Sequence, residues 1–148
     1  MKARGFTLLE LLTAIVVIAI LTAMGSATLY RAKNAAYMAA MESDLRNLIH
    51  AQEEYNASTG GYFADDPNAD GGATYTKSTE KLDFTPSENV VVKIRANRRG
   101  WSARAEHENL SPERFFCAVY IGEVEPFSPA EEEGVIACEP KGKKKKDK

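Results

Sequence analysis

The spacing of hydrophobic positions changes twice along this chain. A nearly continuous apolar run, residues 6–29, comes first and contains one charged residue, Glu10. Over residues 30–55, apolar side chains recur about every 3.5 residues with no proline or glycine between them, which is typical of an amphipathic helix. After Gly60-Gly61 the pattern changes to short β-rich runs separated by turn formers. The pattern therefore predicts helix first and strands afterwards.

The first two regions together predict one long helix. Residues 6–29 would extend about 36 Å at about 1.5 Å per residue, enough to cross a bilayer core of about 30 Å. In residues 30–59 the helical spacing gathers apolar side chains into one stripe. This stripe consists of Met38, Met41, Leu45, Leu48, Ile49 and Tyr55. We expect a transmembrane or filament-core helix at 6–29, followed by a helix at 30–59 that forms the spine of a head.

The remaining residues predict a small antiparallel sheet. Turn formers are dense in residues 60–88, which predicts a long loop. The sheet is expected within residues 89–140. Its β-rich runs are 90–96, 101–107 and 115–121, with a short fourth candidate at 134–138 and a hairpin turn at 97–100. The expected fold class is α+β, with one long N-terminal helix packed on a sheet of three or four strands in a head of residues 30–140.

Charge narrows the possible functions. The chain has 148 residues and a formal net charge of -2, so it lacks the overall basicity that indicates nucleic-acid binding. Basic residues gather at both ends, with Lys2 and Arg4 before the apolar run and six lysines in residues 141–148. We interpret residues 141–148 as a flexible, solvated tail. Binding of DNA or anionic lipid there would be unspecific and sensitive to salt, and no specific nucleic-acid binding is expected.

The charge of Glu10 helps to decide among the possible interpretations of the apolar run. A basic start, an apolar core and the small residues 25–27 also fit a secretory signal peptide cut after Ala27, and the run alone fits a plain membrane anchor. A charge inside the apolar region costs about 2.5–3.5 kcal/mol on insertion scales, and neither alternative gives a reason for it. No other group of the same helix is expected to pair with this carboxylate. Cleavage after Gly5 would create an amine at Phe6, and staggered copies of the helix can place that amine beside Glu10 of the next copy.

The same residues resemble a known processing signal. The basic leader, Gly5 and the stretch Phe6-Thr7-Leu8-Leu9-Glu10-Leu11-Leu12 are similar to the class III signal of type IV pilins and of the related pseudopilins of type II secretion. The resemblance implies that a prepilin peptidase removes residues 1–5 by cutting between Gly5 and Phe6. It also implies N-methylation of Phe6 and a role of Glu10 in assembly.

The resemblance implies a structural protein. The first interpretation is a subunit of a type IV pilus that assembles through its hydrophobic N-terminal helix and serves adhesion, motility or DNA uptake. The alternatives are a pseudopilin or minor pilin of a secretion or competence machine, and a membrane-anchored or secreted binding module that does not polymerise. The implied partners are identical subunits, the prepilin peptidase, an assembly platform in the inner membrane, and the membrane itself before assembly. The implied location is the inner membrane first, and then an extracellular pilus at the cell surface or a periplasmic pseudopilus.

The two cysteines, Cys117 and Cys138, both lie in the last third of the chain. With the N-terminus in the membrane and the head outside the cytoplasm, the compartment is oxidising, which favours a disulfide over a metal pair or free thiols. Such a bond resembles the C-terminal disulfide-bounded loop of many type IV pilins. Many pseudopilins lack one, so the cysteines favour a pilus subunit.

The sequence gives little support for a catalytic site. The two histidines, His50 and His107, have no serine, cysteine or carboxylate at a spacing that suggests a catalytic group. We therefore expect that the protein is not an enzyme.

One fragment resembles a metal site. Asp66, Asn68 and Asp70 match the start of a calcium-binding loop, but Lys77 stands where the closing glutamate should be. We interpret the fragment as a polar loop and expect no cofactor, with calcium as the only candidate.

Overall fold

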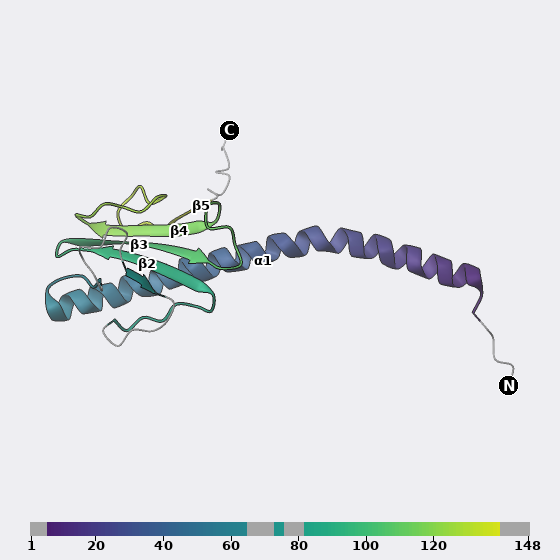
Figure 1. The fold of residues 1–148 in the computed structure, drawn as a ribbon, viewed down its shortest axis with the longest axis horizontal. Coiled ribbons are helices and arrows are strands. Elements are labelled where there is room, and N and C mark those ends of the chain that lie inside the picture. Colours follow the sequence, from purple (N-terminus) through teal and green to yellow (C-terminus); the bar gives the residue numbers. More distant parts are fainter. Residues whose placement is uncertain (1–5, 65–72, 76–81, 140–148) are drawn as a thin grey trace. The chain divides into compact units, whose positions relative to one another are not determined.

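A computed structural model of the chain describes residues 6–64, 73–75 and 82–139, without the side chains of residues 23–27 and 73–75. The chain divides into two compact units, Met1–Ala35 and Ala36–Lys148. Helix α1, Leu8–Thr59, contributes to both units, and all the described strands belong to the second (Figure 1). The second unit is the head, and it begins at Ala36, where the sequence predicts a head from residue 30.

Helix α1 confirms the long helix that the sequence predicts. Its backbone remains helical through Gly25 and Ser26, which weaken a helix far less than a proline would. Gly60 ends the helix with a φ of 75°, and its N–H donates to the carbonyl oxygen of Asn56 at 2.8 Å. Glycine adopts this left-handed conformation without strain, and such residues commonly end helices. The predicted end at residue 59 is therefore confirmed.

The head contains one antiparallel sheet with five strands in sequential order (Figure 1). The strands are β1 Ala73–Tyr75, β2 Val90–Ala96, β3 Gly100–His107, β4 Phe116–Gly122 and β5 Ala137–Glu139. The α+β class is confirmed, and β2, β3 and β4 agree with the predicted runs to within about one residue. The sheet has one strand more than the three or four expected, because the short strand β1 lies inside the region predicted to be a loop. A strand of three residues is too short for its alternation to be detected.

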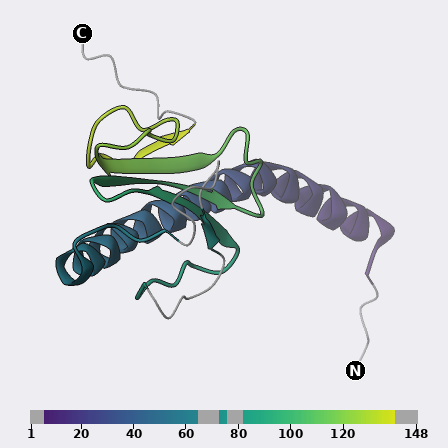
Figure 2. The ribbon, with the colours of Figure 1, turned by 60° about the vertical axis from the view of Figure 1, so that its left-hand side comes forward.

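One face of the sheet packs on the part of α1 that belongs to the head (Figure 2). The inner face presents side chains with no exposed surface from three strands: Val92, Ile94, Trp101, Ala103, Ala105, Cys117 and Val119. From the helix, Met41, Leu45 and Leu48 are equally buried in the same cluster. The apolar stripe that the sequence predicts is therefore the face of the helix that covers the sheet.

Two buried polar side chains of α1 hold the connection between the helix and β2. Asp44, 2% exposed, accepts hydrogen bonds from the backbone N–H and the hydroxyl of Ser87, each at 2.8 Å. Gln52, with no exposed surface, donates to the carbonyl oxygen of Phe63 at 2.9 Å and accepts its N–H at 2.8 Å. Buried polar groups are tolerated when they are hydrogen-bonded in this way. The two side chains therefore hold the start and the end of the segment between α1 and β2.

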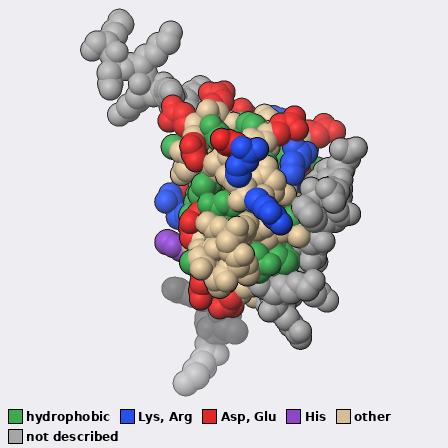
Figure 3. Space-filling model, turned by 90° about the vertical axis from the view of Figure 1, so that its left-hand side faces the viewer, with side chains coloured by type: hydrophobic (Ala, Val, Ile, Leu, Met, Phe, Trp, Pro, Cys, Tyr) green, Lys and Arg blue, Asp and Glu red, His purple; other side chains and the backbone are tan. Residues whose placement is uncertain are grey.

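The end of the head at which α1 finishes is polar. Figure 3 looks onto this end and shows acidic side chains around its edge, with Lys and Arg side chains between them. Arg99 and Glu123 form an ion pair of 2.8 Å here, and Arg95 and Glu125 form one of 3.4 Å. Ion pairs as exposed as Arg99 and Glu123 contribute only about 0–1 kcal/mol. Arg99 and Glu123 are therefore expected to contribute little to the stability of the head.

Within the described residues, which do not include the side chains of residues 23–27, no helix is long and apolar enough to cross a bilayer. The transmembrane or filament-core role of residues 6–29 stays a prediction.

Candidate functional site

The N-terminal end of α1 carries a reciprocal hydrogen-bonded pair. Thr7 precedes the first helical residue, and its Oγ1 accepts the backbone N–H of Glu10 at 3.2 Å. In return, Oε2 of Glu10 accepts the backbone N–H and the hydroxyl of Thr7, both at 3.4 Å. This arrangement is a capping box, in which threonine caps the helix and a glutamate three residues later returns the bond. Thr7 therefore helps to start the helix and also orients the Glu10 side chain.

The capping box corrects one sequence-based expectation about Glu10. The expectation that no group of the same helix pairs with this carboxylate is wrong, because Thr7 supplies two donors. The signal is present in the sequence, since Thr-x-x-Glu before an apolar run is the pattern of a capping box. Both bonds are exposed and long, and hydrogen bonds of this length are weak. A charged donor from another molecule can therefore compete for the carboxylate.

The hydroxyl groups of the threonines farther along the segment donate hydrogen bonds within the helix. The hydroxyl of Thr13 donates to the carbonyl oxygen of Glu10 at 3.0 Å, and that of Thr22 donates to the carbonyl oxygen of Ile18 at 2.7 Å. A hydroxyl bonded to its own backbone needs no outside partner when it is buried. These two side chains therefore do not oppose burial of the segment in an apolar environment.

Apolar side chains cover the surface of α1 from its start to residue 22. Phe6 is 86% exposed, and Leu8 and Leu9 are 81% and 74% exposed. The same surface continues through further apolar side chains that are about half exposed or more: Leu11, Leu12, Ile15, Val16, Val17, Ile18, Ile20 and Leu21. Single exposed apolar residues are ordinary, but a continuous apolar surface marks an interaction site. We therefore expect this surface of the segment to be buried in an apolar environment.

The predicted disulfide between Cys117 and Cys138 is present in the structure. The two residues lie directly opposite each other in β4 and β5, and they are separated by 21 positions in the sequence. Cys117 has no exposed surface, so one end of the bond lies in the core of the head. The bond attaches the last described strand to a central element of the head.

Between the cysteines, the chain folds over the outer face of the sheet. The N–H of Phe127 donates to the hydroxyl oxygen of Ser102 at 2.8 Å, and the guanidinium of Arg95 lies 4.3 Å from the centre of the Phe127 ring. The N–H of Gly134 donates to the carbonyl oxygen of Tyr120 at 2.9 Å. Non-covalent contacts therefore hold this loop in addition to the disulfide.

Several predicted features lie outside the described residues. These are the leader 1–5 with Gly5, the calcium candidates Asp66, Asn68 and Asp70, and the tail 141–148. Within the described ranges, no group of three or more His, Cys, Asp or Glu side chains could hold a metal ion. The interpretation of the segment 66–70 as a polar loop, with calcium as the candidate ligand, therefore stays untested.

The two histidines lie in different environments. His50 is exposed on α1, whereas His107, at the end of β3, is 4% exposed. Nδ1 of His107 accepts the backbone N–H of Asn109 at 3.2 Å, and burial lowers the pKa of this imidazole more than the Glu108 carboxylate raises it. In the part of the chain that the structure describes, no hydrogen bond joins either histidine to a serine, cysteine or carboxylate side chain. The sequence alone gives no sign that one of the two histidines is exposed and the other buried.

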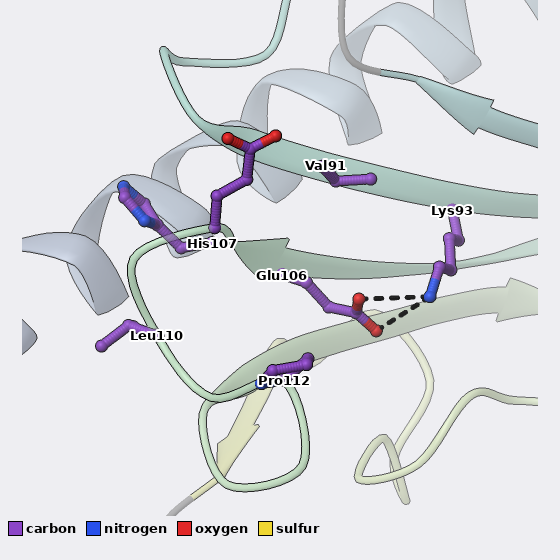
Figure 4. Close-up of a pocket in the computed structure, with 7 residues that line it drawn as sticks. Val91, Lys93, Glu106, His107, Leu110 and Pro112 are labelled. Carbon is purple, nitrogen blue, oxygen red and sulfur yellow. Dashed lines mark hydrogen bonds and ion pairs between the residues drawn. The ribbon is translucent and has the colours of Figure 1, made fainter.

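A depression of about 400 Å³ lies beside the end of β3 (Figure 4). It is lined by Val91, Lys93, Glu106, His107, Glu108, Leu110 and Pro112. The ammonium group of Lys93 lies 3.1 Å from both carboxylate oxygens of Glu106, and Nε of Arg104 lies 2.8 Å from one of them. Glu106 is thus shared between two cationic groups, which makes this an ion-pair network on the sheet surface.

Comparison with known proteins identifies the N-terminal segment. Residues 1–26 match the family model of the prokaryotic N-terminal methylation motif. This motif is the class III signal of type IV pilins and pseudopilins, so the resemblance seen in Gly5, Phe6 and Glu10 is confirmed. No curated protein and no solved structure matches the chain. The chain therefore carries a pilin-type signal, followed by a long helix and an α+β head.

Proposed function

We propose that the protein is a structural subunit of a type IV pilus that assembles through its N-terminal helix. The observation that carries the proposal is the continuous exposed apolar surface of α1, directly after a pilin-type signal. Fully burying one side chain such as Leu, Ile or Val stabilises an assembly by about 1.5–3 kcal/mol. Copies of the helix packed side by side would cover this surface, and the head would remain at the outside.

Glu10 would determine how these helices are staggered. Cleavage between Gly5 and Phe6 creates a positively charged amine at Phe6. Inside an apolar bundle, a carboxylate held only by two bonds of 3.4 Å from Thr7 remains poorly paired. The Phe6 amine of a neighbouring subunit would supply the missing charge. Thr7 would therefore orient Glu10 before assembly, and the neighbour would complete its pairing afterwards.

Processing and location follow from this proposal. A prepilin peptidase would remove residues 1–5 and N-methylate Phe6, and an assembly platform in the inner membrane would add subunits to the filament. The chain would reside in the inner membrane before assembly and in an extracellular pilus afterwards. The protein would act by polymerisation rather than by catalysis.

Sequencing of the mature N-terminus tests the processing step. The proposal expects a chain that begins with N-methylated Phe6. A chain that begins at Thr28, after Ala27, would identify a secretory signal peptide and contradict the proposal.

Mechanical shearing of cells separates a pilus subunit from a pseudopilin or minor pilin. The proposal expects most of the processed chain in long sheared filaments. Processed chain that stays in the membrane fraction, with only traces in filaments, would indicate the alternative. The disulfide between Cys117 and Cys138 supports the pilus subunit, because many pseudopilins lack one.

A further inference from the structure

The buried histidine of β3 is part of the contact between the sheet and the helix. The rings of His107 and Tyr37 are stacked, with centroids 4.1 Å apart and planes inclined by 28°. Figure 4 shows His107 directed toward the helix, whereas the preceding residue, Glu106, is directed toward Lys93. Because the head begins at Ala36, this contact holds the first turn of α1 within the head.

The hydrogen bond of His107 requires a neutral imidazole. Nδ1 accepts the backbone N–H of Asn109 at 3.2 Å, so this nitrogen carries no proton. Protonation would turn Nδ1 into a donor that faces another donor. The turn after β3 depends on the same residue, because the N–H of Leu110 donates to the carbonyl oxygen of His107 at 2.9 Å. A proton on His107 would therefore break the hydrogen bond that holds this turn.

The charged groups around His107 do not compensate for a proton on it. On β3, the Glu106 carboxylate is shared by Lys93 and Arg104. In the turn, the Glu108 carboxylate opposes the effect of burial only in part. The contact from α1 is the phenol ring of Tyr37, and the residue paired with His107 on β2 is the apolar Val90. His107 also lines the edge of the depression in Figure 4.

We propose that His107 is an acid-sensitive clamp, whose protonation breaks its hydrogen bond to Asn109 and releases the turn after β3. Burial lowers the pKa of His107 below the value of about 6.5 that a histidine has in an unfolded chain. The unfolded state therefore binds this proton more tightly than the folded state. The stabilising contribution is complete above about pH 6.5 and is lost as the pH falls from there through the folded-state pKa. In that window the folding equilibrium constant falls by up to about tenfold per pH unit.

The clamp can be tested by an NMR titration of the full chain in detergent micelles, because the chain has only two histidines. The proposal expects His107 to titrate below the pH of about 6.5 that is usual for a histidine, and amide exchange at Asn109 and Leu110 to accelerate as His107 titrates. A midpoint of His107 at or above about pH 6.5, or amide exchange that does not follow His107, would overturn the proposal.

Variants give an independent test by thermal unfolding at about pH 7 and about pH 5. His107→Phe keeps a ring beside Tyr37 but takes up no proton, and His107→Asn keeps an acceptor near Nδ1. Each folded variant is expected to lose less stability between the two pH values than the unmodified protein. His50→Gln is the matched control and is expected to lose as much as the unmodified protein. An equal loss in the His107 variants would contradict the clamp.

Discussion

Removal of the disulfide is expected to weaken the whole head. Replacing Cys117 and Cys138 together by alanine avoids leaving a free thiol. With a separation of 21 residues, the loop-entropy relation gives a loss of about 3 kcal/mol in the free energy of unfolding. Because β4 is a central element and Cys117 lies in the core, the loss should extend beyond the short strand β5. For a domain of this size, the loss corresponds to a fall of about 10 °C in the unfolding temperature.

Urea unfolding followed by the fluorescence of Trp101 measures this loss, since Trp101 is fully buried in the head. Glu123→Ala is the control, because Glu123 belongs to an exposed ion pair and its removal should change stability by less than about 1 kcal/mol. A loss below about 1 kcal/mol for the double alanine variant would refute the reasoning. It would mean that the contacts of Phe127 and Gly134 already close the loop without the covalent bond.

Two further pairs of substitutions probe the head, each measured as the change in the urea midpoint of unfolding at constant slope. Asp44→Ala leaves both donors of Ser87 without their acceptor and should cost about 3 kcal/mol, whereas Glu42→Ala, which removes only an exposed helical pair, should cost about 0.5 kcal/mol. Gly122→Ala and Gly134→Ala both place a side chain at positive φ, but only the first meets a neighbouring carbonyl oxygen. Gly122→Ala should therefore cost about 1–3 kcal/mol more than Gly134→Ala, and equal costs would contradict the packing of this turn.

The long elements could be predicted because their periodicity extends over many residues. The stripe from Met38 to Tyr55 requires a helix with one buried face, and Gly60 marks where it ends. Strands β2, β3 and β4 have seven or eight residues each, enough for β-rich composition to be recognised. The fourth predicted strand is displaced, because Gly134 takes a turn at φ 74° and the pairing of β5 begins only at Ala137.

Features that depend on tertiary contacts could not be predicted. Asp44 and Gln52 are polar residues on a helix, a pattern that normally indicates an exposed face, yet both are buried by partners more than ten positions away. His107 and His50 differ only through what packs around them. The capping box of Thr7 and Glu10 is different, since it is local and its pattern is visible in the sequence.

Glu10→Gln provides the most direct test of assembly through the N-terminal helix. Glutamine at this position preserves the capping box but removes the charge, whereas Glu10→Ala removes both. Leaving the Phe6 amine of each neighbour unpaired should cost about 3–5 kcal/mol per subunit. The measurement is the yield of sheared filaments relative to the pool of processed chain, compared among Glu10, Glu10→Gln and Glu10→Ala. The account predicts normal processing but no filaments for both variants, and normal filaments from Glu10→Gln would contradict it.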